Sequence, residues 1–439
     1  MTAAASFAGT ARPTAATVPS MVEASREPAG WGLALICILS FWTPSAEFGA
    51  SMSLVAARYG LFALSIGLLL TTSSVRQSIN IVGRSAITAL LLATCAYIAA
   101  TSLWSGSLLS GIGKGMLFLE SLLIALLAVG RFGPIRALTI CGSAVLAFVF
   151  VGSILAIVYP VLGQEQWGDH AGMWKGLSNQ KNLFGAAVAI AFIALLQRRT
   201  RPLGLKLIGL ALLAIAMVKS GSRGGEVDLA AGLAFLLVTR LPNKYQRITL
   251  LLIAGVAIAL LLILGTNIDI DTRSGNIGVN DVELDTSNRI KIWQFGLDGF
   301  KGYELFGFGL EGFWTDQRAL QFFGRNGWVL PDFHNGYFSL LIDAGIIGIV
   351  LFGATLLALS LSLLGNLHRL RVLGLQAHGA LIFMFLVHNL YENTIVRATN
   401  GTLFIFEVAA FGYLAAVSRR PAMQQVATVP DPLTALPVR

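Results

Sequence analysis

The chain has 439 residues, of which 55% are hydrophobic and 12% are charged. Soluble globular proteins carry about 25% charged residues, so this chain lacks the polar surface that a soluble enzyme needs. The composition therefore predicts an all-α polytopic membrane protein.

The net charge is +9, from 31 basic and 22 acidic residues. In a soluble protein this excess would suggest nucleic-acid binding, but here it is explained by Lys and Arg in cytosolic loops, and no nucleic-acid partner is expected. The three cysteines, Cys37, Cys95 and Cys141, lie within apolar runs, where Cys behaves as a small hydrophobic residue. The sequence predicts neither a disulfide framework nor a Cys-based metal site.

Residues 1–28 are rich in Ala, Thr, Ser and Pro, and we expect a disordered cytosolic tail there. Apolar runs of spanning length follow, and they predict about twelve transmembrane helices, with ten or eleven as alternatives. Helices 1–9 of this prediction fall within 29–265 and helices 10–12 within 336–417, before a second cytosolic tail at 418–439. The predicted spans are 29–46, 52–70, 85–103, 112–130, 137–159, 182–197, 203–219, 226–239, 247–265, 336–364, 374–391 and 401–417.

Basic residues cluster in alternate connections between the predicted spans, and the positive-inside rule converts this into an orientation. Both termini are predicted to be cytosolic, and the long connection 266–335 to face outside. That connection carries more acidic than basic residues and many aromatic ones. We therefore expect one large, ordered, partly helical loop rather than a solvated tether.

Energy-coupling and metal motifs are absent from the sequence. There is no GxxxxGK[ST] and no HExxH, and the glycine-rich stretch Gly111–Gly115 opens a membrane span on the outer side. We predict no metal and no cofactor.

The polar motifs stand at the outer ends of spans. Ser220–Gly225 is a glycine-rich turn that places Arg223 just before a helix N-terminus, where N–H groups can also bind anions. His334 lies where the long loop re-enters the membrane. The candidate site residues are Arg223, Arg289 and His334 as catalytic residues, and Lys181, Asn182, Lys291 and Asn335 as substrate-binding residues.

Each motif also has a structural interpretation. Arg223 could snorkel to lipid phosphates, Arg289 could be an ordinary loop charge, and Lys181 could be an interfacial anchor. His334 could cap a helix or be a satisfied core histidine. His388, Asn389 and Glu392 could line the same outer cavity, although structural roles are favoured for them.

Two arginines and a neutral imidazole on the outer face suit the chemistry of a lipid-linked pyrophosphate. Guanidinium binds phosphate oxygens in a bidentate manner and keeps its charge. Histidine has an unperturbed pKa near 6.5 and can accept a proton from an attacking sugar hydroxyl. Departure of a pyrophosphate needs positive charge, which Arg223 and Arg289 can supply without a metal.

Four motifs resemble the O-antigen ligase and Wzy-type O-antigen polymerase superfamily over roughly residues 165–415, and their order along the chain matches that of the superfamily. His334-Asn-Gly-Tyr-Phe-Ser-Leu-Leu-Ile-Asp-Ala-Gly-Ile-Ile-Gly348 resembles its histidine signature, and Ser222-Arg223-Gly224 its outward turn. Arg289 to Trp293, followed by Phe306-Gly-Phe-Gly-Leu310, resembles the opening of its large periplasmic loop. Gly176-Leu-Ser-Asn-Gln-Lys-Asn-Leu-Phe-Gly185 is similar to ExoQ-type exopolysaccharide polymerases.

The resemblance implies a GT-C-like membrane glycosyltransferase of the bacterial inner membrane, with its active site facing the periplasm. The implied donor is an undecaprenyl-diphosphate-linked oligosaccharide. Arg223 and Arg289 would bind the diphosphate, His334 would be the general base, and Lys181 would be a further donor-site cation. Membrane lipids are expected partners, while a flippase and a chain-length regulator stay open as protein partners.

The acceptor separates two forms of this function. A polymerase uses another lipid-linked repeat unit, and a ligase uses lipid A–core. We favour the polymerase, for exopolysaccharide or O-antigen, because of the Asn-Gln-Lys-Asn stretch. A transporter or flippase of an anionic or lipid-linked glycan is a further alternative, in which His334 would be a gate or a proton relay.

Overall fold

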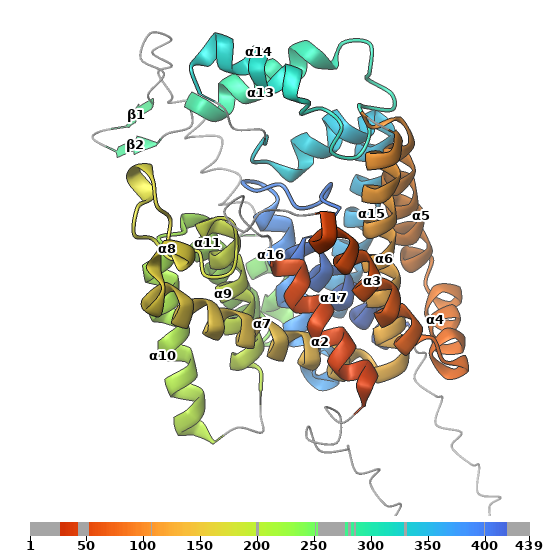
Figure 1. Ribbon diagram of the computed structural model, residues 1–439. Helices are drawn as coiled ribbons and strands as arrows, with labels where there is room; N and C mark the ends of the chain where they lie inside the picture. The colour runs from red at the N-terminus through yellow and green to blue at the C-terminus, as the bar shows by residue number, and fades with distance from the viewer. Residues whose placement is uncertain are drawn as a thin grey trace, which may run out of the picture.

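The computed structural model describes residues 27–42, 52–106, 108–198, 202–250, 252, 277–279, 282–284, 287–328, 332–398 and 400–418. Almost all of it is helical (Figure 1). The long helices are α2 (Pro28–Phe41), α3 (Met52–Leu69), α4 (Thr72–Arg84), α5 (Ala86–Ala100), α6 (Leu108–Phe132), α7 (Pro134–Val158), α9 (Lys181–Leu196), α10 (Leu203–Ser220), α11 (Arg223–Val238), α13 (Ser287–Phe300), α14 (Asp316–Asn326), α15 (Gly336–Leu373), α16 (Gln376–His388) and α17 (Gly401–Val417). The short elements are η2 (Thr101–Trp104), α8 (Pro160–Gly163), η3 (Gly168–His170), and an antiparallel pair of strands, β1 (Ile277–Val279) and β2 (Val282–Leu284).

The predicted class, an α-helical membrane protein with several spans, is confirmed. In the described residues five helices are long and apolar enough to cross a membrane, or six if the bent pair α3–α4 forms one span. Four further helices, α2, α9, α16 and α17, are apolar but shorter. The predicted number of about twelve is therefore not confirmed. Most of the predicted span 247–265 and nearly all of both predicted tails lie outside the described residues.

Helix α4 occupies a segment that the sequence analysis treats as a connection. Thr71 caps it by accepting a hydrogen bond from the Ser74 backbone N–H at 3.2 Å, and it bends away from α3 by 92°. The helix is amphipathic and packs against α6, where Gly130 gives room for the Ser78 side chain. Its Arg residues lower the mean hydropathy of the segment, so the helical spacing of its apolar residues is overlooked and the sequence predicts a connection where a helix forms.

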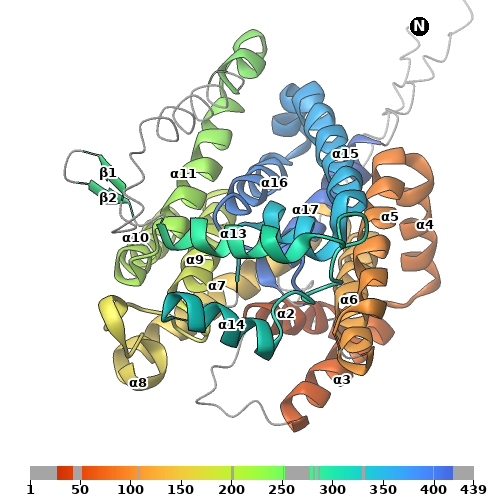
Figure 2. The ribbon, with the colours of Figure 1, turned by 90° about the horizontal axis from the view of Figure 1, so that it is seen from above.

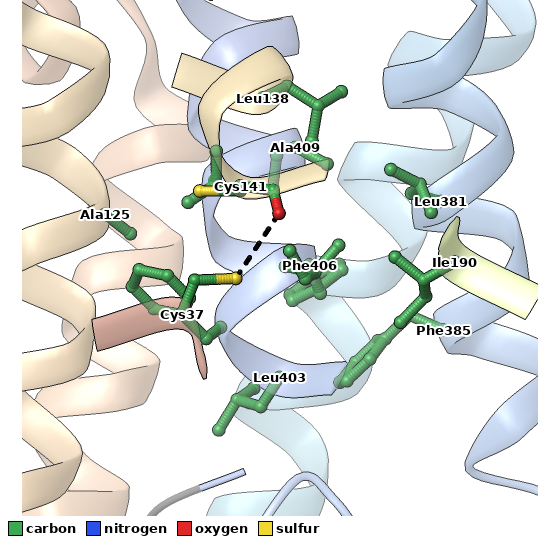
Figure 3. Packing of buried hydrophobic residues seen from close by; sticks show 14 of the residues in the cluster. Cys37, Ala125, Leu138, Cys141, Ile190, Leu381, Phe385, Leu403, Phe406 and Ala409 are labelled. Atoms are coloured by element: carbon green, nitrogen blue, oxygen red, sulfur yellow. Dashed lines mark hydrogen bonds between the residues drawn. The ribbon is translucent and has the colours of Figure 1, made fainter. Parts of the chain in front are cut away.

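Helix α17 lies at the centre of the bundle, and its residues are buried on every side from Gly401 to Ala415. A helix that is apolar all round is expected in such a position. Phe406 of α17 stacks on Phe385 of α16 with ring centroids 4.0 Å apart. Beside them the Cys37 thiol donates to the Cys141 carbonyl oxygen at 3.6 Å (Figure 3). All three cysteines are buried as free thiols and fill apolar space.

Helices α13 and α14 come from the predicted large loop and lie across one end of the bundle (Figures 1 and 2). An aromatic cluster joins them, centred on Phe313, whose ring meets those of Phe295, Trp314 and Phe333 at 5.1–5.9 Å. The Trp293 indole N–H donates to the Phe333 carbonyl oxygen at 2.8 Å. Helices α13 and α14 and the loop between them are called the cap below. Aromatic packing fixes the cap onto the residues that lead into α15.

The cap is docked into a break in α15 at Gly345, whose φ is +69°. Here the Phe308 and Gly309 N–H groups donate to the carbonyls of Ile342 and Asp343 at 3.0 and 2.7 Å. A Cβ at Gly345 would lie 2.2 Å from the Leu305 oxygen, so only glycine fits. Gly307 and Gly309 of the loop and Gly345 of the His334–Gly348 segment therefore pack against each other at one contact, which we call the glycine joint.

Candidate active site

His334 stands in the short segment that enters α15, close under the cap. Its φ is +49°, a left-handed conformation that few residues other than glycine adopt. The following residue, Asn335, caps α15 by accepting from the Phe338 N–H at 2.9 Å, and its amide N–H donates to the Leu390 carbonyl at 3.0 Å. The interpretation of His334 as a helix cap is therefore wrong, because Asn335 has that role. Strained backbone held by its surroundings is typical of functional sites.

The imidazole of His334 is paired with the carboxylate of Glu392. The His334 Nδ1 atom lies 3.5 Å from Glu392 Oε2, and the two side chains are only 13% and 8% exposed. Neither ring nitrogen of His334 forms a hydrogen bond with a described residue, and both atoms are buried. Burial alone would lower the pKa of His334, but the carboxylates of Glu392 and Asp332 outweigh burial and the nearby Arg289, and the pKa is raised above its usual value. His334 is thus a stronger base than a free histidine, with Nδ1 beside the Glu392 carboxylate and Nε2 without a partner among the described residues.

Asn182 connects this pair to the turn that carries Arg223. Its amide N–H donates to Glu392 Oε1 at 2.8 Å, and its amide oxygen accepts from the Ser222 hydroxyl at 3.4 Å. Ser222 caps α11 by accepting from the Gly225 N–H at 3.1 Å. Helices α9 and α11 approach closely here, because a Cβ at Gly185 would lie 2.4 Å from that of Ser222.

Arg223 is the first residue of α11, and its side chain is exposed. It forms no hydrogen bond or ion pair with a described residue. Lys181, the first residue of α9, lies within electrostatic range of it and donates from Nζ to the Gly221 carbonyl at 3.2 Å. Positive charge and the N-terminal N–H groups of α11 therefore coincide at this turn.

Helix α13 brings a further cation to the site. Arg289 is half-buried, and its charge acts on His334 by opposing protonation of the ring. Lys291, on the same helix, is exposed and has no hydrogen bond or ion pair within the part of the chain that the structure describes. The structure thus joins six of the seven predicted residues through direct contacts or electrostatic range, and Lys291 lies apart from this network.

The turn from His388 to Glu392 holds both sides of the site. His388 Nδ1 lies 2.8 Å from Asp228 Oδ2 in a buried pair. The Tyr391 hydroxyl donates to the Gly224 carbonyl at 2.7 Å and contacts Asp228, and its ring packs where a Cβ of Gly224 would lie. Tyr391 therefore fixes the Arg223 turn, while Glu392 fixes His334.

These positioning residues are the part that the sequence analysis missed. The sequence predicts structural roles for His388 and Glu392, and the buried pair with Asp228 agrees with such a role for His388, but the contact of Glu392 with His334 is not predicted. The available signal was the acidic residue four positions after His388, in a segment already assigned to the outer side. Nothing in the sequence pairs that acid with a histidine 58 positions earlier.

A second charged network lies on the other side of His334. Asp332 accepts from the His334 backbone N–H at 3.2 Å and pairs with Arg397. Burial would raise the pKa of Asp332, but Arg397 and His334 lower it, so this carboxylate stays charged. Lys114 pairs with Glu311 at 3.3 Å. The lysine of the Gly111–Gly115 stretch is therefore a structural cation.

In a comparison with known protein families, residues 208–353 match the family described as O-antigen ligase. No curated protein matches the chain. The matched region contains Arg223, Arg289, His334 and the glycine joint at Gly345. The resemblance inferred from the motifs is thereby confirmed for residues 208–353, which match the O-antigen ligase domain.

Proposed function

We propose that the protein is a glycosyltransferase that transfers glycan from undecaprenyl diphosphate at the periplasmic face of the bacterial inner membrane. The observation that carries the proposal is the His334–Glu392 pair, in which Nε2 of His334 has no partner among the described residues and several cations lie nearby. Members of the matched family act as ligases or polymerases on lipid-linked glycans, which agrees with this chemistry.

The donor diphosphate is held by Arg223 and Arg289 in this proposal. Arg223 stands at a helix N-terminus and forms no ion pair with a described residue, and Arg289 comes from the cap above the site. Guanidinium groups bind phosphate oxygens in pairs and remain charged at any physiological pH. Lys181 adds charge beside Arg223. Together they stabilise the negative charge that grows on the leaving diphosphate.

The acceptor hydroxyl attacks the anomeric carbon on the face opposite the diphosphate. The new C–O bond forms as the bond from the anomeric carbon to the diphosphate oxygen breaks, and the hydroxyl proton passes to His334 Nε2. Glu392 stabilises the imidazolium that results, as a carboxylate behind a general base does. Direct attack inverts the anomeric configuration.

Glu392→Gln should shift the acidic limb of the pH dependence of kcat/KM to lower pH. Only neutral imidazole can take the proton, so activity rises as the pH passes the pKa of His334. In the wild type that pKa is raised, because two carboxylates outweigh burial and Arg289. Gln keeps an oxygen for the Asn182 amide but removes the charge, so the pKa of His334 falls. A lower plateau is also expected, since the weaker base transfers the proton less readily.

The profile is measured as kcat/KM over about pH 5 to 9, where histidine titrates. Glu226→Gln is the matched control, because it removes the same charge from an exposed position in the first turn of α11. A Glu392→Gln profile that superimposes on that of the wild type would refute the pairing as the cause of the raised pKa.

The acceptor decides between polymerase and ligase. The Asn-Gln-Lys-Asn stretch favours a polymerase of exopolysaccharide or O-antigen repeat units, whereas the description of the matched family favours an O-antigen ligase acting on lipid A–core. The choice between polymerase and ligase can be tested by complementing a deletion strain and separating surface lipopolysaccharide and secreted polysaccharide on gels. Loss of polymer in the deletion strain with lipid A–core still capped supports the polymerase, and polymer retained on its carrier with uncapped lipid A–core supports the ligase. Unchanged glycans would instead favour a transporter.

A further inference from the structure

A cavity of about 750 Å³ lies at the end of the bundle opposite to His334. It is formed where α9 and α11 end, where α15 ends, and where α10 and α16 begin. Its volume falls within the range of small-molecule sites, roughly 300–1,000 Å³. The lining residues are Leu196, Gln197, Arg198, Leu203, Lys206, Arg240, Arg371 and Gln376.

The lining is strongly basic and contains no carboxylate. Lys206 donates from Nζ to the carbonyls of Leu196 and Arg198 at 2.5 and 3.1 Å, which fixes its position but leaves its charge uncompensated. The side chains of Arg240 and Arg371 are exposed and form no hydrogen bond or ion pair with a described residue. Several like charges around one cavity repel each other, so an anion bound there would be stabilised.

The N-termini of α10 and α16 add backbone N–H donors, which carry partial positive charge. Neither Pro202, before α10, nor Leu375, before α16, caps its helix with a side chain. The first residues of these helices, Leu203 and Gln376, line the cavity. Uncapped N–H groups together with arginine side chains are the combination that binds phosphate oxygens.

The surface next to the cavity is suited to acyl chains. Helix α10 lies at the edge of the bundle (Figures 1 and 2), and only 22% of its apolar stretch is buried. Apolar side chains are exposed along its whole length, from Leu203 (71%) to Val218 (74%). A lipid whose headgroup enters the cavity could therefore lay its chains along α10.

We propose that this cavity binds the phosphate headgroup of an anionic phospholipid. Basic pockets between transmembrane helices on the side that carries excess Lys and Arg are suited to such headgroups. The site is distinct from the proposed donor site, since the 18 residues of α10 separate it from Gly221 by about 27 Å. One diphosphate cannot occupy both.

The test uses the full-length protein in nanodiscs of phosphatidylcholine with or without diphosphatidylglycerol, and measures thermal unfolding and lipid retention by native mass spectrometry. Arg240→Gln/Arg371→Gln should weaken retention of diphosphatidylglycerol by about 25-fold, since each basic residue contributes about a fivefold factor. Neither side chain has a partner among the described residues, so the fold should persist. Arg369→Gln is the matched control, because Arg369 lies on the same helix end but bonds to Asn366 and does not line the cavity.

Soluble inorganic diphosphate, added to phosphatidylcholine nanodiscs, is the second arm. Stabilisation by diphosphatidylglycerol that the double variant loses supports the lipid assignment. Stabilisation by soluble diphosphate but not by the lipid, lost in the double variant, would overturn the lipid source and assign the cavity to a soluble phosphate; diphosphate bound at Arg223 and Arg289 would stabilise the wild type and the double variant equally. Equal lipid retention by wild type and double variant would overturn the site itself.

Discussion

Replacing His334 with alanine should lower the rate of glycosyl transfer by roughly 10²- to 10⁴-fold, the usual contribution of a general base. Donor binding should stay nearly intact, because the diphosphate is bound by Arg223 and Arg289 and not by the imidazole. The measurement is a single-turnover assay with labelled lipid-linked oligosaccharide in nanodiscs, together with a separate determination of donor affinity.

The backbone of His334 calls for a second variant. Its φ of +49° is strained for alanine but tolerated by asparagine. His334→Asn therefore keeps the turn and removes only the base, and it should be as inactive as His334→Ala. Full activity of either variant at neutral pH would contradict the general-base assignment. Loss of donor binding in the alanine variant alone would instead identify a structural defect of the turn.

The residues placed by local pattern were found from the sequence. Arg223 follows a serine that caps a helix, and His334 precedes an asparagine that caps another. Both residues lie in short polar segments between apolar runs. The hydropathy pattern marks these segments as ends of membrane spans, and the alternation of basic connections predicts that they lie at the same membrane face. Both residues lie within the region 208–353 that matches the O-antigen ligase family.

The pairing of charges could not be found in this way. Asp228 and His388 meet because α11 packs against α16, and Glu392 meets His334 because the turn after α16 folds back over the start of α15. Such contacts depend on which helices are neighbours, and apolar spans of similar composition do not encode their neighbours in a readable pattern. A single sequence therefore indicates that Asp228 needs a partner without identifying it.

Two features of the fold that the sequence does not predict, the break in α15 and helix α4, have local causes. The break in α15 is hidden because Gly345 lies within a long apolar run, where glycine is common in membrane helices. Only the cap, whose loop around Gly307 and Gly309 fills the break, makes the position special. Helix α4 was read as a connection because polar and basic residues outnumber apolar ones there, although its apolar side chains recur with helical spacing.

Arg223→Gln should reduce both donor affinity and turnover, with a combined loss in kcat/KM of about 10²- to 10³-fold, comparable to removal of an oxyanion donor. The guanidinium would act on the diphosphate in the ground state and more strongly as charge develops on it. Arg223→Lys should recover only part of this loss, since an ammonium group keeps the charge but not the paired N–H donors. The measurement is kcat and KM for the lipid-linked donor, with thermal unfolding of each variant.

Folding should be unaffected in both variants, because Arg223 is exposed and has no hydrogen bond or ion pair within the described residues. Lys219→Gln is the matched control, since it removes an exposed cation from the end of α10, on the other side of the same turn. If the long-range positive field were sufficient, the two Gln variants would lose similar activity. A specific diphosphate contact requires that Arg223→Gln lose far more than Lys219→Gln, and equal losses would reject it.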